Sequence, residues 1–202
     1  MNVKGKFLGL LGAVALCVMV TPGTASATNI LINPGFETGI LSPWVNSVPL
    51  NFCGSCAWVV TSTDAHTGTN SATITGNRLI LQTFSPIATS LITQASLWLR
   101  MPGGSPTAAA IYFGYSDGSS AEFSASPTSA WAFVNMTGNL AVGKNLVAFG
   151  VYGCNGCGGV GSTFADDFVI DAAVAAVPEP GTLALVGLGV LGAAARIRRR
   201  RQ

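Results

Sequence analysis

Four cysteines form two Cys-x-x-Cys pairs, Cys53 with Cys56 and Cys154 with Cys157. This spacing suits three kinds of chemistry: zinc binding by four thiolates, thiol–disulfide exchange, or structural disulfides. Redox exchange by such a pair normally belongs to a βαβ context, and no helical pattern accompanies these cysteines. The choice between zinc and disulfides depends on the compartment, because disulfides persist where the surroundings are oxidising.

Candidate catalytic residues are few. His66 is the single histidine, it stands among turn-forming residues, and no recognisable nucleophile motif lies beside it. No two carboxylates stand in a context that indicates a glycosidase pair. Asp166 and Asp167 are neighbours in a predicted strand, so we expect their side chains to point to opposite faces. The sequence therefore predicts a protein that is not an enzyme.

Residues 1–27 have the pattern of a secretory signal peptide. Lys4 and Lys6 precede an apolar stretch, and Ala25 and Ala27 form a small-residue cleavage site. We expect a signal-peptide helix that signal peptidase removes during export. Because an exported protein meets oxidising surroundings, disulfides are favoured over zinc for the two cysteine pairs, with all three pairings open.

The C-terminal segment, residues 177–202, has three blocks in a fixed order. A Pro-Glu-Pro motif is followed by an apolar run, Thr182 to Ala195, and then by arginines. The motif is Pro178, Glu179 and Pro180, and the arginines are Arg196, Arg198, Arg199, Arg200 and Arg201. As a helix the run would be about 21 Å long against a hydrocarbon core of ~30 Å, which predicts a short transmembrane helix and a temporary anchor. The arginines would hold its end on the cytoplasmic side.

This order of blocks resembles the PEP-CTERM sorting signal of Gram-negative bacteria. The resemblance implies an exosortase as partner, a membrane enzyme that cuts near the Pro-Glu-Pro motif. It also implies a location: the inner membrane transiently, then the cell surface or the extracellular matrix. A hydrophobic tail that is held only until a transpeptidase removes it follows the same logic as a GPI signal.

Residues 28–176 remain as the body of the protein, a size that fits one domain. Its basic residues are Arg78, Arg100 and Lys144. Its acidic residues are Glu37, Asp64, Asp117, Glu122, Asp166, Asp167 and Asp171. A weakly acidic body excludes nucleic acid as a partner, because binding phosphates depends on Lys and Arg. The positive charge of the whole chain belongs to its two ends.

Apolar residues in the body recur with a period of two, which is typical of β-strands. The predicted strands are TNILIN, AWVVT, SATIT, RLILQTF, LITQASLWLR, AAAIYFGY, AEFSA, WAFVNMT, NLVAFGVY and FADDFVIDA. Turn clusters such as MPGGSP and SDGSS separate them. The fold class is therefore all-β, an antiparallel β-sandwich or jelly roll, with strand order left open.

Three patches of the body resemble the galactose-binding-like jelly rolls of carbohydrate-binding modules. They are NPGFETGILSPW from Asn33, DAHTGTNSATI from Asp64 and FADDFVIDA from Phe164. In that family the Glu of the opening motif and an Asp of the closing strand hold a structural calcium. The resemblance therefore implies a calcium held by Glu37 and Asp166, with Asp167 as the alternative, and calcium prefers such oxygen ligands.

The remaining question at the level of sequence is what the exported body binds. Rings that could stack on sugars are Trp58, Trp98, Trp131, Tyr112 and Tyr115, although packing is the more common role of strand aromatics. We expect a non-enzymatic envelope protein that works with exopolysaccharide or biofilm matrix and binds a glycan. The alternatives are a structural or adhesive surface protein without a ligand pocket and a small polysaccharide hydrolase.

Overall fold

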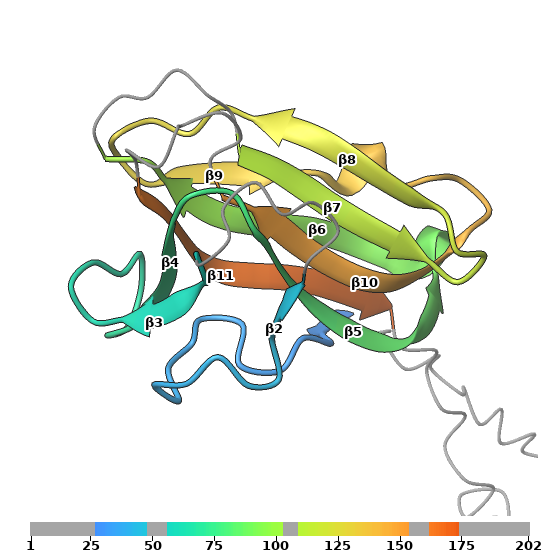
Figure 1. Cartoon of the computed structure of the whole chain (residues 1–202). Coiled ribbons are helices and arrows are strands. Elements are labelled where there is room, and N and C mark those ends of the chain that lie inside the picture. Colours follow the sequence, from blue (N-terminus) through green and yellow to red (C-terminus); the bar gives the residue numbers. More distant parts are fainter. Residues whose placement is uncertain (1–26, 48–55, 103–108, 154–161, 174–202) are drawn as a thin grey trace, which may run out of the picture. The chain divides into compact units, whose positions relative to one another are not determined.

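The computed structural model describes residues 27–47, 56–102, 109–153 and 162–173, and these residues form an antiparallel two-sheet β-sandwich (Figure 1). The strands are β1 (Ala27–Asn29), β2 (Val45–Ser47), β3 (Val59–Thr61), β4 (Ser71–Thr75), β5 (Leu79–Ala88), β6 (Ile92–Arg100), β7 (Ala109–Tyr115), β8 (Ser120–Ala125), β9 (Ala132–Asn135), β10 (Asn145–Tyr152) and β11 (Ser162–Ala173). Two 3-10 turns, η1 (Thr89–Leu91) and η2 (Thr137–Asn139), are the helical elements of the described residues. The predicted all-β fold is confirmed.

Both predicted terminal helices lie outside the described residues, and so do the sorting motif and the arginine cluster. Within the part of the chain that the structure describes, no helix has the length and apolar character needed to cross a membrane.

Each sheet is built from antiparallel pairs. Sheet A has the strand order β3-β4-β11-β6-β9, and β1 also pairs with β11. Sheet B has the order β2-β5-β10-β7-β8. The longest strand, β11, therefore lies inside sheet A, between β4 and β6, whereas β9 is an edge strand.

Period-two alternation decides which side chains enter the space between the sheets. In β6, Ala95, Leu97 and Leu99 are fully buried, whereas Trp98 and Arg100 face outward and keep partial exposure. Because successive strand side chains point to opposite faces, the same rule gives each sheet an outer face of its own.

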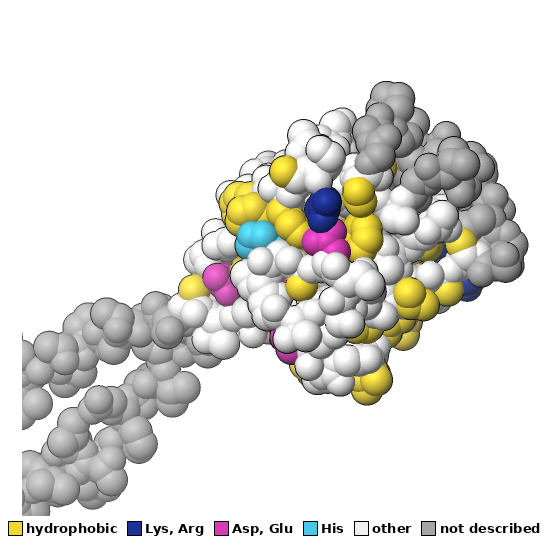
Figure 2. All heavy atoms as spheres, turned by 90° about the vertical axis from the view of Figure 1, so that its left-hand side faces the viewer, with side chains coloured by type: hydrophobic (Ala, Val, Ile, Leu, Met, Phe, Trp, Pro, Cys, Tyr) yellow, Lys and Arg dark blue, Asp and Glu magenta, His cyan; other side chains and the backbone are white. Residues whose placement is uncertain are grey.

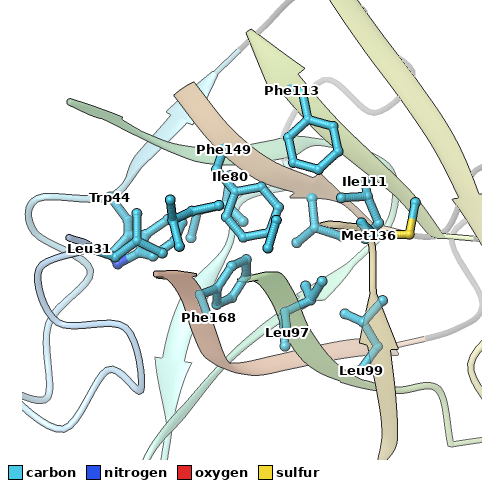
Figure 3. Packing of buried hydrophobic residues seen from close by; sticks show 14 of the residues in the cluster. Leu31, Trp44, Ile80, Leu97, Leu99, Ile111, Phe113, Met136, Phe149 and Phe168 are labelled. Carbon is cyan, nitrogen blue, oxygen red and sulfur yellow. The ribbon is translucent and has the colours of Figure 1, made fainter. Parts of the chain in front are cut away.

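Aromatic rings fill the centre of the core (Figure 3). Phe113 and Phe149 stack with centroids 5.4 Å apart, Phe149 meets Phe168 at 5.7 Å, and Phe168 meets Trp44 at 4.5 Å. Rings in sheet B are thereby joined to Phe168 in sheet A and to Trp44 just before β2. Each buried ring stabilises the fold by about 1.5–3 kcal/mol through loss of apolar surface from water.

The first and last strands of the sandwich pair with each other. Ala27 lies opposite Ala173, and Asn29 lies opposite Asp171. The Asn29 side chain adds a second link, since its amide donates to the Phe168 carbonyl at 2.8 Å and accepts from the Ile170 N–H at 3.1 Å. The described chain therefore begins and ends at neighbouring positions of sheet A.

Candidate functional site

A bulge in β11 brings two predicted site residues to the same loop. Pairing with β6 shifts between Asp166 and Val169, and Asp167 has a φ of 46°. The expectation that Asp166 and Asp167 point to opposite faces is therefore wrong, because this left-handed residue interrupts the alternation. Both carboxylates contact the β3–β4 loop, residues 62–70.

Asp166 is fully buried and is held by backbone amides. One carboxylate oxygen accepts from the N–H groups of His66 at 2.8 Å and Thr67 at 3.4 Å, and the other accepts from the Asp167 N–H at 2.8 Å. Burial, and then the nearby Asp167 carboxylate, raise the pKa of Asp166 to about 6. Desolvation thus outweighs the amide hydrogen bonds, which favour the ionised form.

Asp167 holds the histidine side chain. Its carboxylate lies 2.6 Å from His66 Nδ1 and accepts from the Thr67 hydroxyl at 2.8 Å. The His66 ring in turn stacks on Trp98 of β6, with centroids 3.7 Å apart and planes 15° apart. Sequence reasoning gave His66 no role beyond a turn. The sequence pattern could not indicate this contact, because residues 66, 98 and 167 are far apart in the sequence and come together only in the folded protein.

Glu37 fastens the same loop from the N-terminal side. Its carboxylate accepts from the N–H groups of Thr69 at 3.0 Å and Asn70 at 2.8 Å. Gly68 has a φ of 65°, and a Cβ there would lie 2.5 Å from the Glu37 carboxyl carbon, so both backbone and space require glycine. A Cβ on Gly35 would lie 3.2 Å from an Asp167 oxygen and 3.5 Å from an Asp166 oxygen.

The structure therefore gathers Glu37, Asp166 and Asp167 around one loop, as the resemblance requires. Their carboxylates are already partnered by N–H and hydroxyl donors, and the described residues contain no group of three or more His, Cys, Asp or Glu placed to hold a metal ion. Two adjacent carboxylates, one of them buried, are nevertheless an environment that a cation would stabilise. A structural calcium held by Glu37 and Asp166, with Asp167 as the alternative, stays a prediction.

Calcium is expected to raise the melting temperature of the exported protein if this prediction holds. At a calcium concentration a hundredfold above Kd the gain is about 2.7 kcal/mol, or roughly 5–10 °C for a chain of this size. Asp166→Asn is expected to remove the rise measured by calorimetry, whereas Asp171→Asn, on the same strand, keeps it. Identical melting curves in calcium and in EDTA would show that no calcium stabilises the fold.

The cysteines and processing residues are only partly visible. Cys56 takes part in a disulfide, and its carbonyl accepts from the Arg78 guanidinium at 2.8 Å. Cys53, Cys154 and Cys157 lie outside the described residues, so the pairing stays a prediction. Ala27 begins β1, whereas Ala25 lies outside the described residues.

The outer face of sheet A carries a continuous set of aromatic rings. Trp98 pairs across strands with Phe133 of β9, with centroids 5.4 Å apart. The ring centroid of Trp131 lies 5.8 Å from that of His66 and 6.5 Å from that of Phe164 of β11. We call Trp98, Trp131 and Phe133 the aromatic face. Figure 2 shows the histidine among hydrophobic side chains on this side of the molecule, next to a basic and an acidic side chain.

The outer face of sheet B carries tyrosines instead. Tyr112 of β7 lies between Gly150 of β10 and Glu122 of β8, and its ring is 6.3 Å from that of Tyr152. A Cβ on Gly114 would lie 3.2 Å from the Tyr112 hydroxyl, so the Tyr112 ring lies along the sheet over Gly114. We call Tyr112, Tyr152 and Glu122 the tyrosine face.

The hydroxyl of Tyr152 belongs to a hydrogen-bonded group. Burial, and then hydrogen bonding to the Glu122 carboxylate, raise the pKa of Tyr152, so the hydroxyl stays neutral. Leu79 and Leu81 of β5 pack with Tyr152 and Tyr112 into a second small apolar cluster. The tyrosine face thus combines a flat ring, apolar neighbours and an exposed carboxylate. Tyr152 is itself buried, like Trp58 and Tyr115 in the core, so Tyr112 and Glu122 are the solvent-accessible members of this face.

The fold is an antiparallel two-sheet sandwich similar to that of carbohydrate-binding modules. The tandem domain CBM22-1-CBM22-2 of Paenibacillus barcinonensis Xyn10C matches with a TM-score of 0.51 and 16% identity, over 80% of this chain and 50% of that one. The CBM22-1 xylan-binding domain of the same protein gives a TM-score of 0.47 and 16% identity, over 70% and 93%. TmCBM61, in complex with β-1,4-galactotriose, gives a TM-score of 0.47 and 22% identity, over 70% of this chain and 97% of that one.

The C-terminal segment carries the PEP-CTERM protein-sorting motif, matched over residues 176–200. This motif implies an exported, cell-surface-directed protein that an exosortase processes. The comparison with curated proteins finds no match.

Proposed function

We propose that this is an exported envelope protein that binds a polysaccharide of the extracellular matrix without cleaving it. Sorting accounts for its delivery, and the tyrosine face accounts for its binding. The observation that carries the proposal is the Tyr112 ring lying over Gly114 beside Glu122. Sugars present apolar ring faces and hydroxyls together, so a flat aromatic ring next to a few polar groups suits them.

The arrangement favours binding over hydrolysis. Glu122 is hydrogen-bonded to Tyr152, and Asp166 is buried beneath the β3–β4 loop. Hydrolysis of a glycoside needs two carboxyl groups on either side of the scissile bond. The acids that lie together, Asp166 and Asp167, are committed instead to holding that loop. We therefore assign the surface a non-catalytic role in exopolysaccharide or biofilm matrix.

Tyr112→Ala is expected to weaken polysaccharide binding at least tenfold, because a central aromatic contact is worth about 2 kcal/mol. Tyr112→Phe keeps the ring, and its affinity is expected to stay within about threefold of the wild-type affinity. Such a change is smaller than the net free energy of a typical hydrogen bond. Affinity electrophoresis of the exported protein in gels containing matrix polysaccharide, xylan or β-1,4-galactan measures the change.

Val142→Ala is the control, because Val142 is 98% exposed in the turn before β10. Unchanged mobility of the wild-type protein in every polysaccharide would contradict binding and favour a purely adhesive or structural surface protein. Release of reducing sugar by the wild-type protein would contradict the non-catalytic role.

A further inference from the structure

The aromatic face lies on the sheet opposite the tyrosine face. Phe133 is on the edge strand β9 and is 48% exposed, an unusual exposure for a ring of that size. Trp98 and Trp131 are each half-buried beside it. With His66 and Phe164 they form a contiguous row of rings that runs from the edge of sheet A to its central strand.

These rings are fixed before any partner arrives. The Trp131 indole N–H donates to Asp64 at 3.1 Å, and the Arg100 guanidinium pairs with the same carboxylate. Arg100 also donates to the Ser129 carbonyl at 2.7 Å, which ties the turn before β9 to β6. His66 covers one face of Trp98. A surface whose side chains are already ordered loses little conformational entropy on binding.

The charges of this face indicate the chemistry of its partner. Arg100, its cation, is neutralised by Asp64, and the nearby acids Asp166 and Asp167 are occupied by the β3–β4 loop. An anionic polymer would therefore find no unpaired cation here among the described residues. An exposed polar side chain flanks the rings, because Asn135 follows Phe133 by two residues on β9 and lies opposite the buried Ser96. Rings bordered by neutral hydrogen-bonding groups suit a neutral polysaccharide.

We propose that the aromatic face is a second carbohydrate-binding surface, specific for neutral polysaccharide, and that one domain bridges two polysaccharide chains. The inference rests on the proposed function for its ligand class, but it depends on different residues. Because the two surfaces lie on the outer faces of opposite sheets, both can be occupied at once. Bridging of chains would make the protein a cross-linker of the matrix, and two linked contacts raise avidity without new interactions at either one.

Isothermal titration of the exported, processed protein with linear xylan and β-1,4-galactan oligosaccharides tests this proposal. We expect two equivalents per wild-type chain, one for Phe133→Ala, one for Tyr112→Ala, and none for the double variant. Phe133 is half exposed on an edge strand, so its replacement leaves the fold intact. Val59→Ala is the matched control, since Val59 is 53% exposed on the other edge strand of sheet A and is expected to keep two equivalents.

Each result separates the two proposals. One equivalent that only Tyr112→Ala removes would overturn the second surface and leave the proposed function standing. One equivalent that only Phe133→Ala removes would overturn the tyrosine face and the bridging, although the aromatic face would remain a binding surface. Tighter binding of oligouronates than of neutral oligosaccharides would overturn the predicted specificity. A wild-type dimer that Phe133→Ala dissociates in analytical ultracentrifugation would assign the face to self-association and overturn the proposal.

Discussion

Replacing Gly150 with alanine is expected to lower the free energy of unfolding by about 3 kcal/mol. Gly150 lies in β10, between β5 and β7 in sheet B. A Cβ there would overlap the Ile80 carbonyl oxygen and would lie 2.7 Å from the Leu81 Cβ. The Ile80 oxygen is a backbone atom, so the paired strands β5 and β10 must separate to accept the methyl group. The loss of stability is therefore expected at the upper end of the range for overpacking substitutions.

Urea unfolding of the exported protein measures this change. Gly138→Ala is the matched control, because a Cβ on Gly138 meets nothing within 4 Å, and its effect should stay within about 0.5 kcal/mol. Equal stability of the two variants would mean that β5 and β10 are not packed as closely as described. The tyrosine face would also suffer from Gly150→Ala, since Tyr112 lies directly opposite Gly150.

Replacing Pro178, Glu179 and Pro180 together with alanine is expected to abolish C-terminal processing. The sorting motif spans residues 176–200, and this triplet is the part that the exosortase is expected to read. The variant should keep its apolar run and arginines and accumulate in the inner membrane. Intact mass spectrometry of the protein recovered from the producing cell measures the loss of cleavage.

Val177→Ala, directly before the triplet, is the control for a change at the same place in the chain. It is expected to be processed like the wild-type protein, and removal of the signal peptide should proceed in both variants. A triple variant released from the cell with the wild-type mass would show that these three residues are not needed for sorting.

The strands could be predicted from sequence because each carries its own local pattern. All ten predicted segments overlap a strand of the sandwich, including the long run in β11 that the bulge at Asp167 interrupts. The missing strand, β2, has only three residues, Val45 to Ser47, which is too short to show a period. The strand order could not be predicted, since β11 pairs with β4 and β6 through contacts far apart in the sequence.

The candidate sites show the same division between local pattern and tertiary structure. The motifs at Glu37 and Asp166 were visible because a resemblance to known jelly rolls marks them, and the fold does bring them to one loop. The part played by His66 could not be predicted, because its partners Trp98 and Asp167 are supplied by two different strands. Likewise, Tyr112 lies flat over Gly114 and opposite Gly150, and Gly150 belongs to the neighbouring strand β10.

The location of β11 in the middle of sheet A has a mechanical consequence. The chain beyond residue 173 follows directly from this strand, so any pull on the C-terminal end of the chain would reach the body through β11. The ladders to β4 and β6 would then bear the load in shear, many hydrogen bonds at once, instead of opening one by one as at a peeled edge strand. A tether attached at this strand would resist tearing better than one attached at an edge strand.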